Sequence, residues 1–177
     1  MLRRTLGRSL GAAEGDSATA ITRPYGHAPA GIRGICQTEA ESALQLPANV
    51  EAYPEQIAIA LNRLRHGGIG GPYAVALSEP CYTGLTEATK GGYPVLEHVR
   101  RLFEGPIVWA PGLEGAVVLS MRGEDYELTV GQDFSIGYLS HDAERVRLYI
   151  GESFTFWNIT PEAAVHLPLG TGEKSSQ

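Results

Sequence analysis

The most regular alternation of hydrophobic and polar residues along this chain lies close to its C-terminal end. On an extended backbone, Val146, Leu148 and Ile150 share one face, and Phe154 and Phe156 share a face farther along. A period of two in β-branched and aromatic residues indicates a half-buried β-strand. Because the run is longer than an ordinary strand of about 5–6 residues, we expect one long bent strand or two nearly collinear ones.

The residues before this run predict the other half of a hairpin. The charged segment 140–145 is typical of a turn, and it follows a strand expected around residues 134–138. Residues 131–157 therefore predict a long β-arm beside the core of a compact domain.

Helical periodicity predicts three helices in the middle of the chain. In the clearest one, Ile57, Leu61 and Leu64 recur on one face behind Pro54, and two glycines are placed to end the helix. The other two are a weaker helix near residues 79–88 and a helix that opens at Pro94.

Short apolar runs bounded by turn-forming residues predict the strands of the same region. They cover residues 73–77, 107–109, 117–120 and 126–130. The last run is expected to pair with the run before it, through a turn at residues 122–125. Because helices and strands mix without regular alternation, the pattern favours an α+β fold over a doubly wound sheet.

The two ends of the chain carry weaker signals. Leu2, Leu6 and Leu10 have helical spacing, although each glycine among them weakens a helix by about 1 kcal/mol relative to alanine. The start lacks the continuous apolar segment of a signal peptide. The polar residues 170–177 are expected to form a disordered tail.

Composition and charge narrow the class of protein. With 177 residues, 43% of them hydrophobic, the chain is long enough to bury a core of its own. A net charge of −6 argues against a nucleic-acid partner, and no apolar run of about 18 residues is present to span a membrane. Cys36 and Cys81 lack metal-ligand spacing; two free thiols are favoured over one disulfide, which indicates a reducing, cytoplasmic setting.

Three motifs resemble catalytic or binding sites, and each has a plainer interpretation. Residues 7–11 match G-x-S-x-G, but they lack the strand that must precede a nucleophile elbow. Ser140, His141 and Asp142 are neighbours on one turn, where a catalytic triad cannot form. Residues 67–72 are rich in glycine but lead into a strand, so no helix N-terminus is available for a phosphate.

The remaining titratable residues predict no active site either. Glu124 and Asp125 are expected to be solvated acids in a turn, and the five histidines lack the spacing of a zinc or iron site. His98 is expected at the surface of its helix. We therefore expect no enzymatic activity, no bound cofactor and no metal site.

Aromatic side chains gather in the second half of the chain. Because aromatic residues are usually well buried, we expect about four of them in the domain core. The rest indicate contacts between copies of the chain. The residues concerned are Trp109, Tyr126, Phe134, Tyr138, Phe154, Phe156 and Trp157.

Several blocks of sequence, taken together, carry a resemblance to a known family. They are GIRGI at 31–35, GIGGPYAVAL at 68–77, GYPVLEHVRRLFEGPIVWAP at 92–111, GAVVLSMRGEDYELTVGQD at 115–133 and GQDFSIGYLSHDAERVRLYIGESFTF at 131–156. In this order, from about residue 13 to residue 167, the chain resembles the encapsulin shell proteins, also called the linocin or bacteriocin family.

The resemblance implies the fold of the tailed-phage major capsid proteins. An apical domain would cover residues 38–127. A peripheral domain would combine residues 1–37 with residues 128–169, and the long β-arm would be its sheet. Residues 1–20 would be the end of a long spine helix, and the N-terminal helix and extended loop of the family would be missing ahead of Met1.

The resemblance also implies a structural function. The chain would be a subunit of a closed icosahedral shell that encloses cargo enzymes, such as peroxidases or ferritin-like iron oxidases. Its partners would be copies of itself and the C-terminal peptide of the cargo, which would lie along two apolar residues of a docking groove. The positions that match this groove are Gln132, Asp133, Phe134, Ser135 and Ile136, of which Phe134 and Ile136 are the apolar ones.

A second set of residues matches the loop that lines the five-fold pore of the family. These are Thr89, Lys90, Gly91 and Gly92. The two glycines predict a mobile tip, and a ring of Lys90 ammonium groups would favour the passage of anions. An ordinary flexible loop is the plainer interpretation of the same residues.

Two alternatives to a shell subunit stay open on the sequence alone. Relatives have been described as bacteriocins or proteases, although this sequence offers no nucleophile in a suitable context. The other alternative is a truncated shell subunit that does not assemble, since the missing loop and helix would remove contacts that lock neighbours together.

Overall fold

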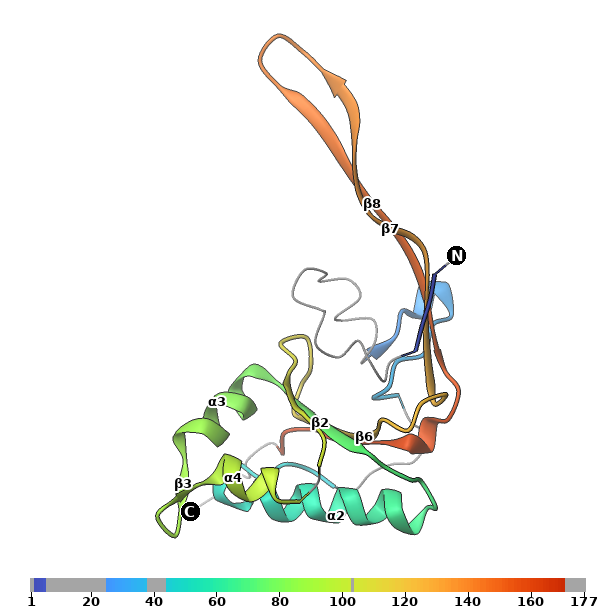
Figure 1. Cartoon of the computed structure of the whole chain (residues 1–177). Helices are drawn as coiled ribbons and strands as arrows, with labels where there is room; N and C mark the ends of the chain where they lie inside the picture. Colours follow the sequence, from blue (N-terminus) through green and yellow to red (C-terminus); the bar gives the residue numbers. More distant parts are fainter. Residues whose placement is uncertain (1, 6–24, 38–43, 103, 171–177) are drawn as a thin grey trace, which may run out of the picture.

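Residues 2–5, 25–37, 44–102 and 104–170 are described by the computed structural model, and they form a central sheet, a long hairpin and a small hairpin (Figure 1). Helices pack around the central sheet, while the long hairpin leaves it and projects outward. The fold is therefore α+β, as the mixed pattern of elements predicts.

The central sheet has four strands in the order β5-β2-β6-β9. β5 is parallel to β2, and the other neighbouring strands are antiparallel. β6 is buried along its whole length, as expected for an inner strand of a covered sheet. The strands are β2 (Tyr73–Leu77), β5 (Ile107–Trp109), β6 (Ala116–Ser120) and β9 (Ala164–Leu167).

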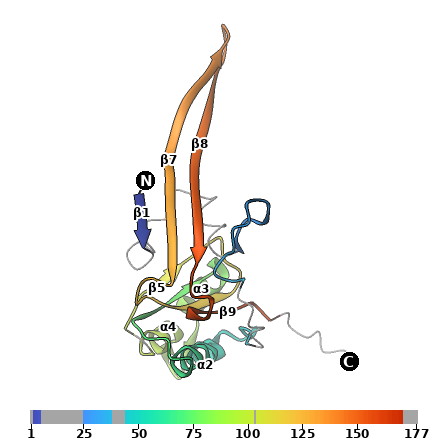
Figure 2. The same cartoon turned by 90° about the vertical axis from the view of Figure 1, so that its right-hand side faces the viewer.

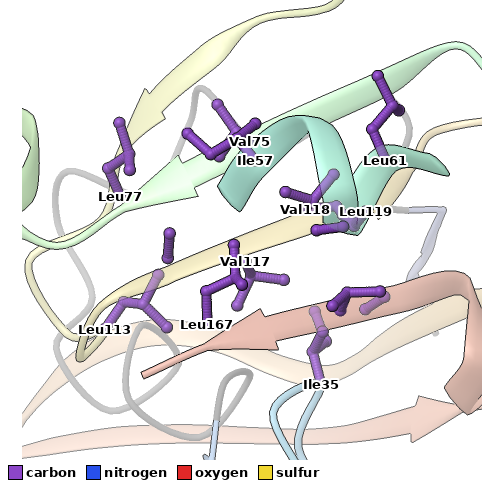
Figure 3. Close-up of a cluster of buried hydrophobic side chains, with 14 of the residues drawn as sticks. Ile35, Ile57, Leu61, Val75, Leu77, Leu113, Val117, Val118, Leu119 and Leu167 are labelled. Atoms are coloured by element: carbon purple, nitrogen blue, oxygen red, sulfur yellow. The ribbon is translucent and has the colours of Figure 1, made fainter. Parts of the chain in front are cut away.

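Helix α2 (Tyr53–His66) packs against this sheet through its apolar face. Ile57 and Leu61 are fully buried, and Figure 3 shows both among the side chains of the central strands. Pro54 lies in the first turn of the helix, and Gly68 follows its end with a positive φ of 73°. The clearest helix predicted from the sequence is thus confirmed.

Shorter elements complete the domain around α2. α3 and α4 contact each other, and a small hairpin of β3 and β4 lies between them in the chain. In the described ranges, no helix is long and apolar enough to cross a membrane. These elements are α3 (Glu79–Glu87), α4 (Val95–Arg100), β3 (Thr89–Lys90) and β4 (Tyr93–Pro94), with 3-10 helices η2 (Ala28–Ala30), η3 (Val50–Ala52) and η4 (Pro161–Ala163).

The long hairpin consists of β7 (Tyr126–His141) and β8 (Val146–Asn158), and it rises away from the domain in both views (Figures 1 and 2). β1 (Leu2–Thr5) pairs antiparallel with the base of β7, which gives a second sheet of order β1-β7-β8. We call residues 131–153 of this hairpin the arm. The sequence predicted one long strand or two nearly collinear ones after the turn, and β8 is a single long strand.

Two predictions about these strands are wrong. Residues 126–130 are not the hairpin partner of β6; they begin β7 and pair with β8 and β1, while β6 pairs with β2 and β9. Leu2 lies in a strand rather than in a helix, because pairing with β7 outweighs a helical spacing already weakened by glycine. Residues 6–20 of the predicted spine helix and residues 171–177 of the predicted tail lie outside the described residues.

The packing of α2 predicts unequal effects for two isoleucines of the same helix. Ile57 is fully buried, whereas Ile59 is 42% exposed. Ile57→Ala should lower the free energy of unfolding by about 2–5 kcal/mol, because it leaves a cavity in the core. Ile59→Ala should cost well under about 2 kcal/mol. Urea unfolding of both variants measures the difference, and equal losses would mean that α2 does not pack as described.

Candidate functional site

The predicted docking residues lie on β7, where the arm leaves the domain. Gln132 Nε2 donates to Ser135 Oγ over 2.7 Å, and Ser135 Oγ donates to the Gly151 carbonyl over 3.1 Å. The Asp133 carboxylate accepts the Phe134 amide over 2.9 Å. The polar side chains of this segment therefore form hydrogen bonds within the arm. Its apolar side chains remain for contact with a partner.

The apolar residues of the predicted docking segment are open to solvent. Phe134 is 54% exposed and Ile136 is 62% exposed. An extended apolar peptide would gain most of its contact area from these two side chains, while backbone groups would fix its register. That a peptide binds here stays a prediction.

One face of the arm is apolar along both strands. Direct cross-strand neighbours share a face, and Ile136 lies opposite Ile150, Tyr138 opposite Leu148. Val146 lies on the same side of β8, because it is two and four residues away from the two β8 residues. We call these five residues, Ile136, Tyr138, Val146, Leu148 and Ile150, the apolar arm face; each is 58–68% exposed.

This exposure corrects the expectation of a half-buried strand. The alternation in β8 is real, but the described residues place nothing over the apolar arm face. Toward the domain the same side of the hairpin enters the core, where Leu128 and Phe156 lie opposite each other and are both buried. The hairpin therefore continues a core face out into solvent.

The opposite side of the arm carries a glycine covered by a tyrosine ring. Gly137 lies opposite Tyr149, and a Cβ added to Gly137 would lie 2.2 Å from the Tyr149 ring. The ring thus covers the backbone where the glycine has no side chain, an arrangement that supports glycine in a sheet. Arg147 and Gly151 also lie on this side, because along β8 they alternate with Leu148 and Ile150 of the apolar arm face.

The tip of the arm is a turn held by its own side chains. The Asp142 carboxylate accepts the amides of Glu144 and Arg145, both over 2.9 Å, and His141 Nδ1 shares a hydrogen bond with the Tyr138 hydroxyl. The sequence Ser140-His141-Asp142 therefore forms part of a tip, as predicted, and Asp142 is oriented toward backbone amides rather than toward a histidine.

The base of the hairpin is fixed by an ion pair that the sequence did not predict. Asp125 is only 2% exposed, and its carboxylate accepts two hydrogen bonds from Arg122, from Nη2 over 2.7 Å and from Nε over 3.0 Å. The Asp125 carbonyl also accepts the amides of Ile159 and Thr160. Asp125 is thus not the solvated acid that was expected. The hydrogen bonds that the guanidinium donates to its carboxylate raise the pKa of Arg122.

The turn beside this ion pair explains why Asp125 points inward. Gly123 and Glu124 have positive φ values of 96° and 68°, so the chain reverses tightly before β7 begins. This reversal brings the carboxylate of Asp125 to the guanidinium three residues earlier. A sequence pattern of arginine and aspartate three residues apart is too common to indicate this pair.

The predicted pore residues form the hairpin of β3 and β4. Thr89 pairs with Pro94 and Lys90 with Tyr93, and the turn residues Gly91 and Gly92 have positive φ values of 61° and 83°. These angles suit a two-residue hairpin turn and explain the two glycines. The side chain of Lys90 donates from Nζ to the Glu51 carbonyl over 3.0 Å. Whether this hairpin lines a pore stays a prediction.

The other chemical groups considered in the sequence form no site among the described residues. No cluster of three or more histidine, cysteine, aspartate or glutamate residues able to hold a metal ion occurs there. Residues 7–11 lie outside the described ranges. His98 is half-buried rather than at the surface, because α4 packs against both α2 and α3.

The two cysteines are free thiols, as favoured from the sequence. Burial raises the pKa of Cys36 to about 12, so this thiol stays protonated near neutral pH. Cys81 is buried, with its Sγ 3.8 Å from the Tyr53 hydroxyl. A buried or protonated thiol is a poor nucleophile and a poor metal ligand.

The aromatic residues divide differently from the expectation of about four in the core. Tyr126 and Phe156 are buried and stack on each other, and Phe154 is half-buried. Burial raises the pKa of Tyr126. The others are exposed, namely Trp109, Phe134, Tyr138 and Trp157.

Comparison with known proteins identifies a family and several relatives that this chain resembles. A family described as "Encapsulating protein for peroxidase" matches residues 25–155 of the chain. A type 1 encapsulin shell protein of Rhodospirillum rubrum is 56% identical over 144 residues, which cover 81% of this chain and 51% of that protein. A type 1 encapsulin shell protein of Brevibacterium linens is 48% identical over 146 residues, covering 82% and 55%. The chain spans about half the length of these curated relatives.

Solved structures support the predicted capsid-like fold. A virus-like particle from Pyrococcus furiosus matches with a TM-score of 0.57 and 21% identity, over 75% of this chain and 58% of that chain. A chain from Mycobacterium phage Che8 matches with a TM-score of 0.51 and 14% identity, over 70% and 50%. Together they confirm the tailed-phage major-capsid-like fold.

The ion pair at the base of the hairpin predicts a specific loss of stability. Asp125→Ala removes the carboxylate and its hydrogen bonds, and the free energy of unfolding should fall by about 2 kcal/mol. The matched control is Glu97→Ala, which breaks the exposed pair between Glu97 and Arg100 and should cost less than about 0.5 kcal/mol. Chemical unfolding followed by tryptophan fluorescence compares the two, and similar losses would contradict a structural role for Asp125.

Proposed function

The chain belongs to the family of encapsulin shell proteins, and on that premise we propose that it is a structural subunit of a closed protein shell that encloses other proteins. The observation that carries the proposal is the match of residues 25–155 to the family described as encapsulating peroxidase. The capsid-like fold supports it, because capsid subunits act by contacting copies of themselves.

The distribution of apolar surface supports a function in assembly. The exposed large apolar residues of the arm include Ile136, Leu148 and Ile150. A monomeric protein rarely exposes so much apolar surface in one place. Trp109 and Trp157 add exposed aromatic surface elsewhere. Such residues are typical of surfaces that become buried between chains.

A finer part of the proposal concerns the enclosed protein. We propose that an apolar C-terminal peptide of the cargo, a peroxidase or a ferritin-like protein, lies along Phe134 and Ile136. Two observations support this proposal. The two side chains are exposed, and the polar side chains beside them already form hydrogen bonds within the arm. The peptide would therefore bind through apolar contact and backbone hydrogen bonds rather than through ion pairs.

Assembly is tested by the size and shape of the purified protein. We expect size-exclusion chromatography to give particles far larger than the 19.0 kDa chain, and negative-stain electron microscopy to show closed shells. A protein that elutes only as a monomer or as small species would contradict the proposal for this chain. It would favour the alternative of a shell fragment that does not assemble.

Cargo docking is tested with a fluorescent protein that ends in the C-terminal segment of a peroxidase from the same genome. We expect it to co-purify with the particles, and Ile136→Asp should abolish this because a charge would be buried under an apolar peptide. Ile59→Asp, at an exposed isoleucine of α2, is the control and should leave co-purification unchanged. Retention of the reporter by Ile136→Asp particles would exclude this docking position.

A further inference from the structure

The small hairpin of β3 and β4 stands out from the packed part of the domain. Residues 89–94 are all exposed, and Figure 1 shows the turn projecting at the edge of the domain. A Cβ added to Gly91 or to Gly92 would meet no atom within 4 Å. A two-stranded hairpin on its own is marginally stable in water. The position of this hairpin therefore depends on the few contacts that connect it to the rest of the domain.

The small hairpin is connected to its surroundings at its root and through one side chain. At the root, the Val95 amide donates to the Ala88 carbonyl over 2.9 Å. Farther out, Nζ of Lys90 donates to the carbonyl of Glu51 over 3.0 Å, and these two residues are 39 positions apart in the sequence. The side chain of Lys90 therefore links the exposed hairpin to a distant part of the chain.

The acceptor of this hydrogen bond belongs to a packed part of the domain. Glu51 lies in η3, which contacts both α2 and α3. Tyr53, the residue that follows η3, is buried. A hydrogen bond donated by an ammonium group is charge-assisted, so it is stronger than one between two neutral groups. Lys90 thus joins an element with little packing of its own to one that is held by two helices.

We propose that Lys90 is a latch that holds the small hairpin against η3, and that neutralising its amine releases the hairpin. Lys90 is then a positioning residue, whose ammonium group sets the position of the turn. Tyr93, which pairs with Lys90 and is 63% exposed, moves with that turn. The inference goes beyond the proposed shell function and does not depend on it, because both partners of the hydrogen bond belong to one chain.

The sequence makes this latch accessible to simple amine chemistry. Lys90 and Lys174 are the lysines of the chain. With acetic anhydride, the amine nitrogen of a lysine forms a bond to an acetyl carbon, the bond from that carbon to the leaving oxygen breaks, and acetate and a proton are released. The product is a neutral amide, so the modified Lys90 no longer brings a positive charge to the Glu51 carbonyl.

Hydrogen exchange, measured by mass spectrometry at single-amide resolution, tests the latch. The Val95 amide reports on the root of the hairpin, because it exchanges when its bond to Ala88 opens. The Val75 amide, which donates to the Pro106 carbonyl over 3.1 Å in the central sheet, reports on the domain as a whole. The variants are Lys90→Met, which removes the amine but keeps an unbranched side chain, and Lys90→Arg, which keeps a cationic donor.

We expect the Val95 amide to exchange about threefold faster in Lys90→Met, because the loss of one exposed hydrogen bond raises the open population by about this factor. Exchange at Val75 should stay unchanged. At Val95, Lys90→Arg should exchange more slowly than Lys90→Met. Tyr93→Phe removes an exposed hydroxyl from the same hairpin; it is the matched control and should exchange like the unaltered chain.

Acetylation gives the same test an independent arm. Acetylating the unaltered chain should accelerate exchange at Val95 as much as Lys90→Met does, and acetylating the Lys90→Met variant should add nothing. Unchanged exchange in Lys90→Met, equal acceleration at Val75, equal rates in the two Lys90 variants, or a further effect of acetylation on Lys90→Met would each overturn the proposal. All samples are compared in the same size-exclusion fraction, so that a failure to form particles is distinguished from a failure of the latch.

Discussion

The antiparallel pairing of β7 with β8 begins inside the core, with Tyr126 opposite Asn158, and continues to the tip, where His141 lies opposite Val146. Pairing along this length fixes which side chains share a face from one end to the other. At the base the shared face is a wall of the core, and in the arm it is bare. The side on which each exposed apolar residue of the arm lies follows from this single ladder.

The direction of the ladder depends on how the chain leaves the central sheet. β6 is buried in the middle of that sheet, and Arg122 and Asp125 lie in the few residues that separate it from β7. Asp125 binds the guanidinium with its carboxylate and the end of β8 with its carbonyl, through the amides of Ile159 and Thr160. One buried residue therefore ties the start of one strand to the end of the other, so the base of the hairpin cannot splay.

Local patterns predicted the elements well, and burial poorly. The spacing of Ile57 and Leu61 gave the face of α2 correctly, because that helix packs within its own domain. The alternation in β8 correctly predicted a strand. It also implied a buried face, but alternation does not show whether such a face is covered by the same chain or by another one. The ion pair of Arg122 and Asp125 left no readable signal, because it depends on a reversal of the backbone at Gly123 and Glu124.

The break in alternation along β7 has a physical meaning. Val130 lies opposite Phe154 and Ile136 opposite Ile150, so β7 contains two more residues than β8 between these pairs, and the register shifts there twice. One extra residue would turn Ile136 and Tyr138 to the side of Tyr149, whereas two return them to the side of Ile150. The bulges therefore interrupt the sequence pattern, which is why residues 126–130 and 134–138 looked like separate strands. They also bring Ile136 and Tyr138 back to the side that carries Leu128 and Phe156 in the core, although Glu152 interrupts this side between Ile150 and Phe154.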